Sequence, residues 1–525
     1  MTPYLRPIDY LIVFVYMASI MGVGLRMARR QKTSADYFIA NRRVPTLAVA
    51  FTLMATVISS ASFVAHPGAV FAKNLYLLPA HIVLPLILIF VVYILIPLYR
   101  RAIRMSSYEY FGRRFGTGAR LYASFGFVVM RMLDLGITLY TAAIAMEVMT
   151  GWDMISVLLG IGLITTIYTM VGGIEGVIWT DVVQGVILVG GMLLILAILL
   201  FQPGTSPGTV LATAYEGGKF SLGNWELSWR SLFEPDATVW VWLAAGFVIM
   251  GRSYTIDQNI VQKYLVARTD REAQRGAMVG ALSCLPIWLT FMLIGACLWS
   301  FYHLTGVELP AEVRSKPDNI LPYFVATQLP SGVVGIVLAA ILAAAQSTVS
   351  ADLNSISTVV TTDYFAHFLP RSTDQARLKF GRGVVLVSGL IITGIALLLT
   401  RTRAVSAVEV GMTLVAIVAG GMLGLFALGF LTRRATTRGA YVGIAASVLF
   451  TGWATLTGPM KIDLGLNFPL NQLLIGVLSQ PVLFVTGYLA SLALGRPATD
   501  VEGLTVWDLQ SRAQAQSLDA TSAQG

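Results

Sequence analysis

One apolar stretch of the chain, residues 336–358, carries a stripe of small side chains and hydroxyls. At helical spacing, one face of this stretch holds Ala344, Ser347, Thr348, Ala351, Ser355 and Thr358. Small residues let two membrane helices pack closely, whereas hydroxyl oxygens can bind an ion. The stretch alone leaves both interpretations open.

A second stretch, residues 55–68, offers backbone oxygens to the same ion. Its serine-rich centre is followed by Pro67 and Gly68, and because proline removes a helical hydrogen bond we expect an interrupted helix. Carbonyls freed by the interruption need new partners in hydrocarbon. The candidate ligands are the carbonyls of Ala55, Ile58 and Ala344 and the hydroxyls of Ser347 and Thr348. About five neutral oxygens suit a hard monovalent cation, while Ca²⁺ or Mg²⁺ favours carboxylates, and none is adjacent in the sequence.

The elements that must position these oxygens are membrane-spanning helices. The 525 residues are 56% hydrophobic and 12% charged, with a mean hydropathy of +0.74, which excludes a soluble domain. The apolar runs are long enough to cross a bilayer as helices and too long for barrel strands. We therefore expect an all-α polytopic membrane protein in contact with the lipid bilayer.

We expect about thirteen spans within one transport domain, residues 1–495. Their predicted ranges are 8–27, 45–71, 77–99, 118–149, 153–171, 178–201, 238–262, 274–303, 321–364, 380–400, 406–431, 438–457 and 469–494. The first span looks like a retained helix and not a removed signal peptide. Alternate loops are basic, which predicts an outside N-terminus and a cytoplasmic polar tail at 496–525, in an inner cell membrane.

Spans two to six (about 45–201) and seven to eleven (about 238–431) form two sets of five, with the two helices at 438–494 following them. An odd number makes the second set enter the membrane from the opposite side, as inverted repeats require. The first span of the second set passes through the polar residues 251–259, so we expect a second interrupted helix there. Two interrupted helices at corresponding positions predict a binding site at mid-membrane.

Several other classes of protein are disfavoured. The net charge of +9 comes from short loops, so we expect no nucleic-acid partner. No phosphate-binding loop or catalytic group set is evident, so we expect neither a pump nor an enzyme, and no cofactor besides a coupling ion. A transporter-like membrane sensor is the alternative from another class of protein. Nothing in the sequence requires an oligomer.

The sequence resembles the sodium/solute symporter family, and within it the bacterial sodium-coupled sialic acid and sugar symporters. The matching segments are Ala55-x-x-Ile58, Gly172–Gly185, Asp257–Lys263, Ala344-x-x-Ser347-Thr348, Leu353–Ser355 and Thr362–Asp363. The resemblance implies a leucine-transporter type of fold, alternating access, and a sodium site formed by Ala55, Ile58, Ala344, Ser347 and Thr348. It also implies a possible second sodium at Asp181 and Ser350. Ala351 stands where two-sodium relatives usually carry a hydroxyl, and the alternative for Asp181 is a helix-end residue bonded to Thr180.

Aligned on this family, the expected substrate contacts are Ser59, Ser62, His81, Asp134 and Asp257. By the same resemblance, Asp134 stands where sialic acid transporters carry an arginine, and a carboxylate there would repel an anion. Arg131, three residues earlier, either pairs with Asp134 within its helix or turns inward and restores anion binding. We expect sodium-coupled import of a small hydrophilic solute, a sugar or polyol, with a sialic acid or other sugar acid as the alternative.

Overall fold

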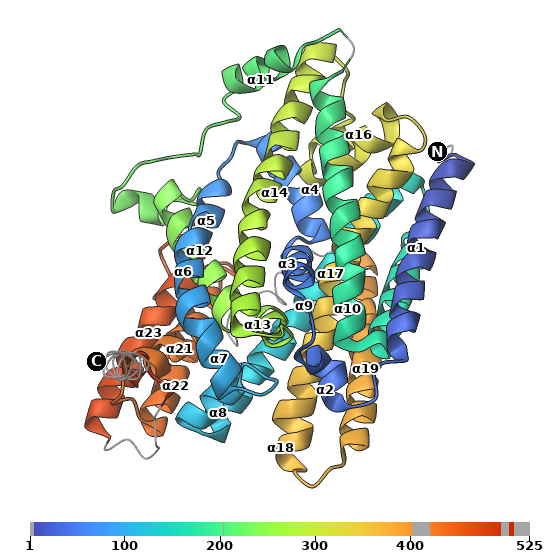
Figure 1. Cartoon of the computed structure of the whole chain (residues 1–525). Coiled ribbons are helices and arrows are strands. Elements are labelled where there is room, and N and C mark those ends of the chain that lie inside the picture. The colour runs from blue at the N-terminus through green and yellow to red at the C-terminus, as the bar shows by residue number, and fades with distance from the viewer. Residues whose placement is uncertain (1–4, 203, 402–419, 495–502, 509–525) are drawn as a thin grey trace, which may run out of the picture.

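The computed structural model describes residues 5–202, 204–401, 420–494 and 503–508. Within these ranges every regular element is a helix, apart from one isolated bridge between Val44 and Ala267. The expected all-α fold class is confirmed (Figure 1).

Most of the long helices coincide with predicted spans. Repeat one and its preceding helices are α1 (Pro7–Ala28), α2 (Ser34–Ile39), α3 (Thr46–Val57), α4 (Ser60–Ala72), α5 (Leu78–Ile82), α6 (Leu84–Phe90), α7 (Ile96–Ala102), α8 (Glu109–Phe115), α9 (Thr117–Thr150) and α10 (Met154–Leu200). The later helices are α11 (Pro207–Glu216), α12 (Val239–Thr255), α13 (Gln258–Leu265), α14 (Asp270–Thr305), α15 (Ala311–Arg314), α16 (Ile320–Gln328), α17 (Val333–Val359), α18 (Ala366–Phe368), α19 (Asp374–Arg401), α21 (Met422–Leu431), α22 (Thr437–Thr457) and α23 (Leu473–Ala493).

Across the described residues, nine helices are long and apolar enough to span a membrane, and two bent pairs raise this number to eleven. The predicted spans 153–171 and 178–201 correspond to two helical segments of α10, which meet at a kink where Gly173 has a positive φ of 55°. A Cβ at Gly173 would lie 2.7 Å from the Tyr37 ring, so both backbone freedom and space require glycine at this kink. Much of the predicted span 406–431 lies outside the described residues, so the count of thirteen stays a prediction.

Both predicted interruptions are present. The α3–α4 pair bends by 56° at Ile58 and Ser59, and the α12–α13 pair bends by 45° at Ile256 and Asp257. The cause expected for the first break is wrong, because α4 continues through Pro67.

The first break comes from the backbone and a cap. Ile58 leaves the helix with an extended ψ of 101°, and the Ser59 hydroxyl accepts a hydrogen bond from the Ser62 amide at 3.4 Å, which caps α4.

The predicted span 321–364 is also wrong as a single helix. α16 ends at Gln328 and α17 begins at Val333, with Pro330 and a positive-φ Gly332 between them.

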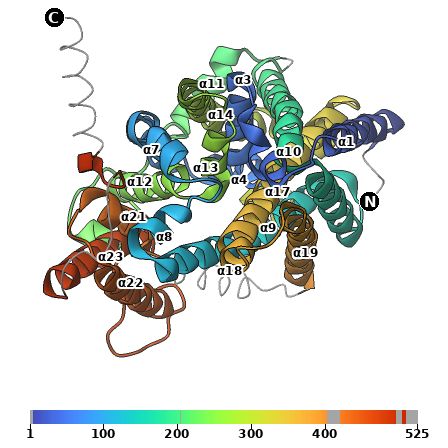
Figure 2. The same cartoon turned by 60° about the horizontal axis from the view of Figure 1, so that its bottom comes forward.

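Helix α17 forms the centre of the bundle, and nearly all its residues are buried. It packs against α10, α9, α1, α3 and α4, and Figure 2 shows it surrounded by these helices. The outer helix α1 is tied to the start of α17 by Asp9, whose carboxylate accepts hydrogen bonds from Gly332 N at 2.7 Å, Gly335 N at 2.8 Å and Ser331 Oγ at 2.9 Å. A buried carboxylate with these donors fixes the position of α1 against α17.

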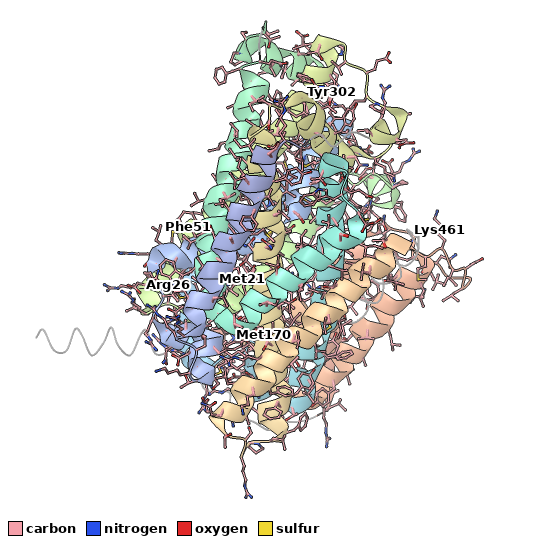
Figure 3. The ribbon with its side chains drawn as sticks, turned by 90° about the vertical axis from the view of Figure 1, so that its right-hand side faces the viewer. Met21, Arg26, Phe51, Met170, Tyr302 and Lys461 are labelled. Carbon is pink, nitrogen blue, oxygen red and sulfur yellow. The ribbon has the colours of Figure 1, made fainter. Side chains whose placement is uncertain are left out.

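Two arginines of the predicted cytoplasmic loops stabilise the fold as well as carrying charge. Arg114 is fully buried and donates to the carbonyls of Gly429, Thr432 and Ala435, which lie at and beyond the end of α21. Arg100 donates to the carbonyls of Tyr264, in the last turn of α13, and Ala267, just beyond it, and pairs with Asp270. Figure 3 shows Tyr302 near one end of the molecule and Arg26 in the opposite half.

Within the predicted tail, residues 503–508 pack onto the body, since Leu504 is buried and its carbonyl accepts from the Tyr110 hydroxyl at 3.0 Å.

Candidate sodium and substrate sites

The break between α3 and α4 lies directly against the hydroxyl stripe of α17. The Ser347 hydroxyl lies 2.9 Å from the carbonyl oxygen of Ala55 and 3.2 Å from that of Ala344. The Thr348 hydroxyl lies 3.2 Å from the Ala344 carbonyl and 3.4 Å from the Thr56 carbonyl. All of these oxygens are buried. The structure thus brings together four of the five predicted sodium ligands and adds the carbonyl of Thr56.

These carbonyls are free because the helix ends at Val57. The last amide that donates along α3 is that of Ile58, which bonds the Met54 carbonyl at 3.1 Å. The carbonyls of Ala55 and Thr56 therefore accept from α17 hydroxyls instead of from their own helix. Ile58 itself is fully buried at the break, and no described hydrogen bond joins its carbonyl to α17.

The oxygen set is neutral. No group of three or more His, Cys, Asp or Glu side chains in the described part of the chain is arranged to hold a metal ion. Carbonyl and hydroxyl oxygens without carboxylates suit a monovalent cation, and a hydroxyl that now donates can turn a lone pair toward such an ion. The donor set therefore fits sodium better than a divalent metal.

Asp181 lies deep within α10 and is fully buried. Its Oδ2 accepts a hydrogen bond from Thr52 Oγ1 at 2.5 Å and lies 3.7 Å from the Nζ of Lys263, which is also buried. The helix-end alternative is wrong, because the Thr180 hydroxyl bonds carbonyls of its own helix. Ser350 donates to the Ser347 carbonyl at 3.2 Å and makes no described hydrogen bond to Asp181. A basic side chain of the protein itself, Lys263, thus lies beside Asp181.

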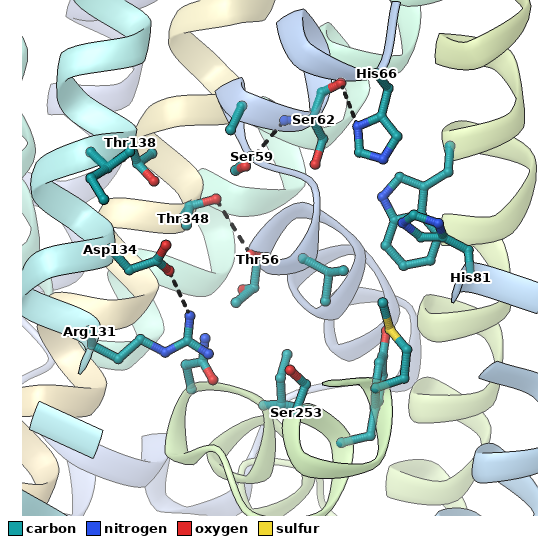
Figure 4. A pocket seen from close by; sticks show the side chains of 18 residues that line it. Thr56, Ser59, Ser62, His66, His81, Arg131, Asp134, Thr138, Ser253 and Thr348 are labelled. Carbon is teal, nitrogen blue, oxygen red and sulfur yellow. Dashed lines mark hydrogen bonds and ion pairs between the residues drawn. The ribbon is translucent and has the colours of Figure 1, made fainter. Parts of the chain in front are cut away.

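Next to the α3–α4 break lies a cavity of about 280 Å³, which Figure 4 shows from close by. Four of the five predicted substrate residues line this cavity, namely Ser59, Ser62, His81 and Asp134. The other polar or aromatic residues lining it are Thr56, His66, Arg131, Thr138, Ser253, Tyr254, Asn259, Trp288 and Thr348. Thr56 and Thr348 belong both to this wall and to the sodium set, so the two candidate sites share side chains.

Two histidines form one wall of this cavity, which we call the central cavity. His81 Nδ1 lies 2.9 Å from the Leu77 carbonyl, and its ring packs 4.2 Å from the Trp288 ring and 5.3 Å from the His66 ring. Sequence reasoning missed His66, whose Nε2 is buried and has no hydrogen-bond partner among the described residues. A buried polar atom beside a cavity favours a ligand that bonds it.

Arg131 of α9 reaches three carboxylates. Its guanidinium lies 3.2 Å from Asp134, 2.8 Å from Asp257 and 3.5 Å from Asp352. Asp257 is at the α12–α13 break and also lies 3.5 Å from Arg252, while Asp352 is on α17. The pair with Asp134 and the inward orientation, expected as alternatives, occur together. Both Asp257 and Asp352 are fully buried.

Asp257, predicted to touch substrate, lies behind Arg131 and does not line the cavity. It therefore orients the guanidinium. Sequence reasoning also missed Asp352 and Lys263, which a rule that any ionisable residue in a span is a functional candidate would have found.

Known proteins resemble this chain over nearly its whole length. The model of the sodium:solute symporter family matches residues 37–446. The chain is 31% identical over 487 residues to the sodium/sialic acid symporter NanT of Aliivibrio fischeri, covering 92% of this chain and 93% of NanT. A solved substrate-bound, outward-open structure of a Na⁺-coupled sialic acid symporter superposes with a TM-score of 0.85 at 30% identity, covering 94% of this chain and 99% of that one.

A more distant likeness concerns the fold alone. Mhp1, a nucleobase-cation-symport-1 family transporter, superposes with a TM-score of 0.52 at 16% identity, over 88% of this chain and 94% of Mhp1. The expected leucine-transporter type of fold is confirmed. The protein is a multi-pass membrane transporter and not an enzyme. The chain belongs to the sodium:solute symporter family.

Proposed function

We propose that this symporter imports a carboxylated sugar of the sialic acid class together with sodium. The observation that carries the proposal is Arg131, whose largely buried side chain (12% exposed) places a guanidinium on the wall of the central cavity. Arginine binds carboxylates through two parallel hydrogen bonds. The Nε of Arg131 has no hydrogen-bond partner in the described structure, and its NH1 contacts with Asp134 and Asp352 are long, at 3.2 and 3.5 Å. The relatives named as sialic acid symporters support the same solute class.

Asp134 need not exclude an anion. Its side chain is about half exposed (53%), whereas Asp257 and Asp352 are fully buried. A substrate carboxylate can therefore replace Asp134 at Arg131, while the two buried carboxylates keep the guanidinium in position. The serines at the α4 start and the histidine wall provide hydrogen-bonding groups for the sugar hydroxyls.

Sodium and solute are coupled through the first break. A sodium ion held by the Ala55, Ala344, Ser347 and Thr348 oxygens fixes the end of α3, and with it Thr56 and Ser59 on the cavity wall. Each ligand thus stabilises the arrangement that the other one needs, and each raises the affinity for the other by the same factor. We expect one sodium per solute, because Lys263 supplies the positive charge at Asp181.

Transport by purified protein in vesicles tests the proposal. An inward sodium gradient is imposed, and labelled sialic acid, a neutral hexose and an amino acid are compared. We expect sodium-dependent accumulation of sialic acid above its outside concentration and none of the other two. Binding without accumulation would support the sensor alternative, and accumulation of the amino acid alone would contradict the solute class.

A neutral polyol is the second candidate, and Asp134 favours it, because an exposed carboxylate accepts hydrogen bonds from hydroxyls. The variant Asp134→Asn separates the two candidates. For a sugar acid, uptake improves because a like charge is removed. For a neutral polyol, uptake weakens because the charged acceptor is lost.

A further inference from the structure

A second and larger cavity, of about 510 Å³, lies where α5, α12 and α23 begin. Its wall combines residues of three segments with Trp242 of α12. The three segments contribute Lys73, Asn74 and Tyr76, then Gly223, Asn224, Pro235, Asp236 and Ala237, and then Asn471, Gln472 and Leu473. Backbone hydrogen bonds tie these segments together, from Leu75 N to the Ser221 carbonyl at 2.9 Å and from Asn471 N to the Leu232 carbonyl at 2.8 Å. The backbone therefore holds together the segments that line the cavity.

We call this second cavity the outer cavity, and it is separate from the central cavity beside the α3–α4 break. Both lie along α12, where Trp242 lines the outer cavity and Met250, eight residues later, lines the central one. At 1.5 Å per helical residue, these positions are ~12 Å apart along the axis. Between them α12 touches α5 so closely that a Cβ at Gly246 would lie 2.3 Å from the Ala80 carbonyl. This contact divides the two cavities.

Two aromatic rings form one side of the outer cavity. The centroids of Tyr76 and Trp242 lie 5.6 Å apart at an angle of 56°, and both side chains are partly exposed. Tyrosine and tryptophan present an apolar face and a polar edge, so they suit a ligand that has both ring carbons and hydroxyls.

Polar groups stand beside these rings. Lys73 Nζ lies 2.7 Å from Asp236 Oδ1, but the two side chains are 58% and 88% exposed, so the pair is weak and exchangeable. The hydrogen bond to Asp236 raises the pKa of the Lys73 ammonium, which is therefore charged at neutral pH. Asn74 and Asn224 use Oδ1 to accept from backbone amides, and their amide nitrogens donate to no described residue.

We propose that the outer cavity is a second binding site for a carboxylated sugar, with the ring against Tyr76 and Trp242 and the carboxylate on Lys73. The identity of the ligand rests on the function proposed above. None of the candidate sodium ligands lines this cavity, so binding here is independent of sodium.

Equilibrium binding of labelled sialic acid to the full-length protein, with and without sodium, tests the proposal. We expect two molecules per protein in sodium and one in its absence. The double variant Ser347→Ala, Thr348→Ala keeps the sodium-independent molecule. The variant Trp242→Ala raises the Kd of that molecule by about tenfold or more, the usual effect of removing a central aromatic contact.

Phe247→Ala is the matched control. Phe247 is five residues away on the same helix, is exposed, and lines neither cavity, so its loss leaves both affinities within twofold of the parent. Sodium-dependent binding that persists in Trp242→Ala shows that this variant is folded. One sodium-dependent molecule alone in the parent protein overturns the outer site and leaves the proposed function standing, whereas no sialic acid binding in any condition overturns both.

Discussion

Removing both α17 hydroxyls should abolish the response to sodium without unfolding the protein. In the double variant Ser347→Ala, Thr348→Ala the sodium set loses two of its oxygens, while the Ala55 and Ala344 carbonyls stay in place. A hydrogen-bonding group that faces a charge contributes ~1.5–3 kcal/mol, so losing two costs ~3–6 kcal/mol. At 1.4 kcal/mol per tenfold change, the affinity for sodium falls by ~10² to 10⁴.

Thermal unfolding in detergent with increasing sodium measures this change. At a sodium concentration of about 100 times Kd, the ion stabilises the parent protein by ~2.7 kcal/mol, and a hundredfold higher Kd reduces this to ~0.4 kcal/mol. The sodium-dependent rise in Tm should therefore nearly vanish, and sodium-driven uptake with it.

Ser355→Ala is the control for this experiment. Its buried hydroxyl, on the same face of α17, donates to the Asp352 carbonyl of its own helix at 2.8 Å and to no other described residue. We expect it to keep the full sodium response. If the double variant shows the same sodium activation as the parent, the coupling site lies elsewhere and the argument from the α3–α4 break is wrong.

Other predictions concern charge and backbone. Lys263→Met leaves Asp181 buried without its cation and should destabilise the protein by ~3–5 kcal/mol, whereas adding Asp181→Asn should restore most of the Tm, because no unpaired charge then remains. If Asp181 instead helps to bind a second sodium ion, Lys263→Met would increase the sodium-to-solute ratio measured by dual-label flux. Gly173→Ala should lower Tm and expression, because its Cβ meets the Tyr37 ring at 2.7 Å in a left-handed backbone, while Gly160→Ala, with open space around it, should not. Asp352→Asn should weaken solute affinity at unchanged sodium affinity in a binding assay, since it loosens Arg131 and touches no sodium ligand.

The sequence predicted the spans because lipid imposes one length and one composition on every crossing helix. It also located both interruptions, since polar residues in the middle of a span are costly in lipid and mark a place where the helix opens onto protein or water. It gave the wrong cause for the first break, because Pro67 is a visible signal while the extended backbone at Ile58 is not. The break between α16 and α17 was missed because the apolar length of 321–364 outweighed the signal of Pro330 and Gly332.

The substrate side was less predictable for a topological reason. Ser347 and Ala55 could be paired because each carries its own chemical signal. The three partners of Arg131 come from α9, the α12–α13 break and α17, and the last two lie more than a hundred residues from Arg131 in the chain. No local sequence pattern indicates that residues so far apart in the chain lie in contact. An inventory of ionisable residues in the spans would have named these groups, although not their arrangement.

The carboxylate of Asp9 has a consequence for how this protein cycles. It clamps the outermost helix to the loop from which α17 starts, and α17 carries the hydroxyls that face the ion. Whichever part of the bundle moves during transport, α1 and α17 should therefore move together as one rigid body. The distance between spin labels on α1 and α17 should be the same in the outward-open and inward-open states. The distance between labels on α1 and α12 should differ between the two states.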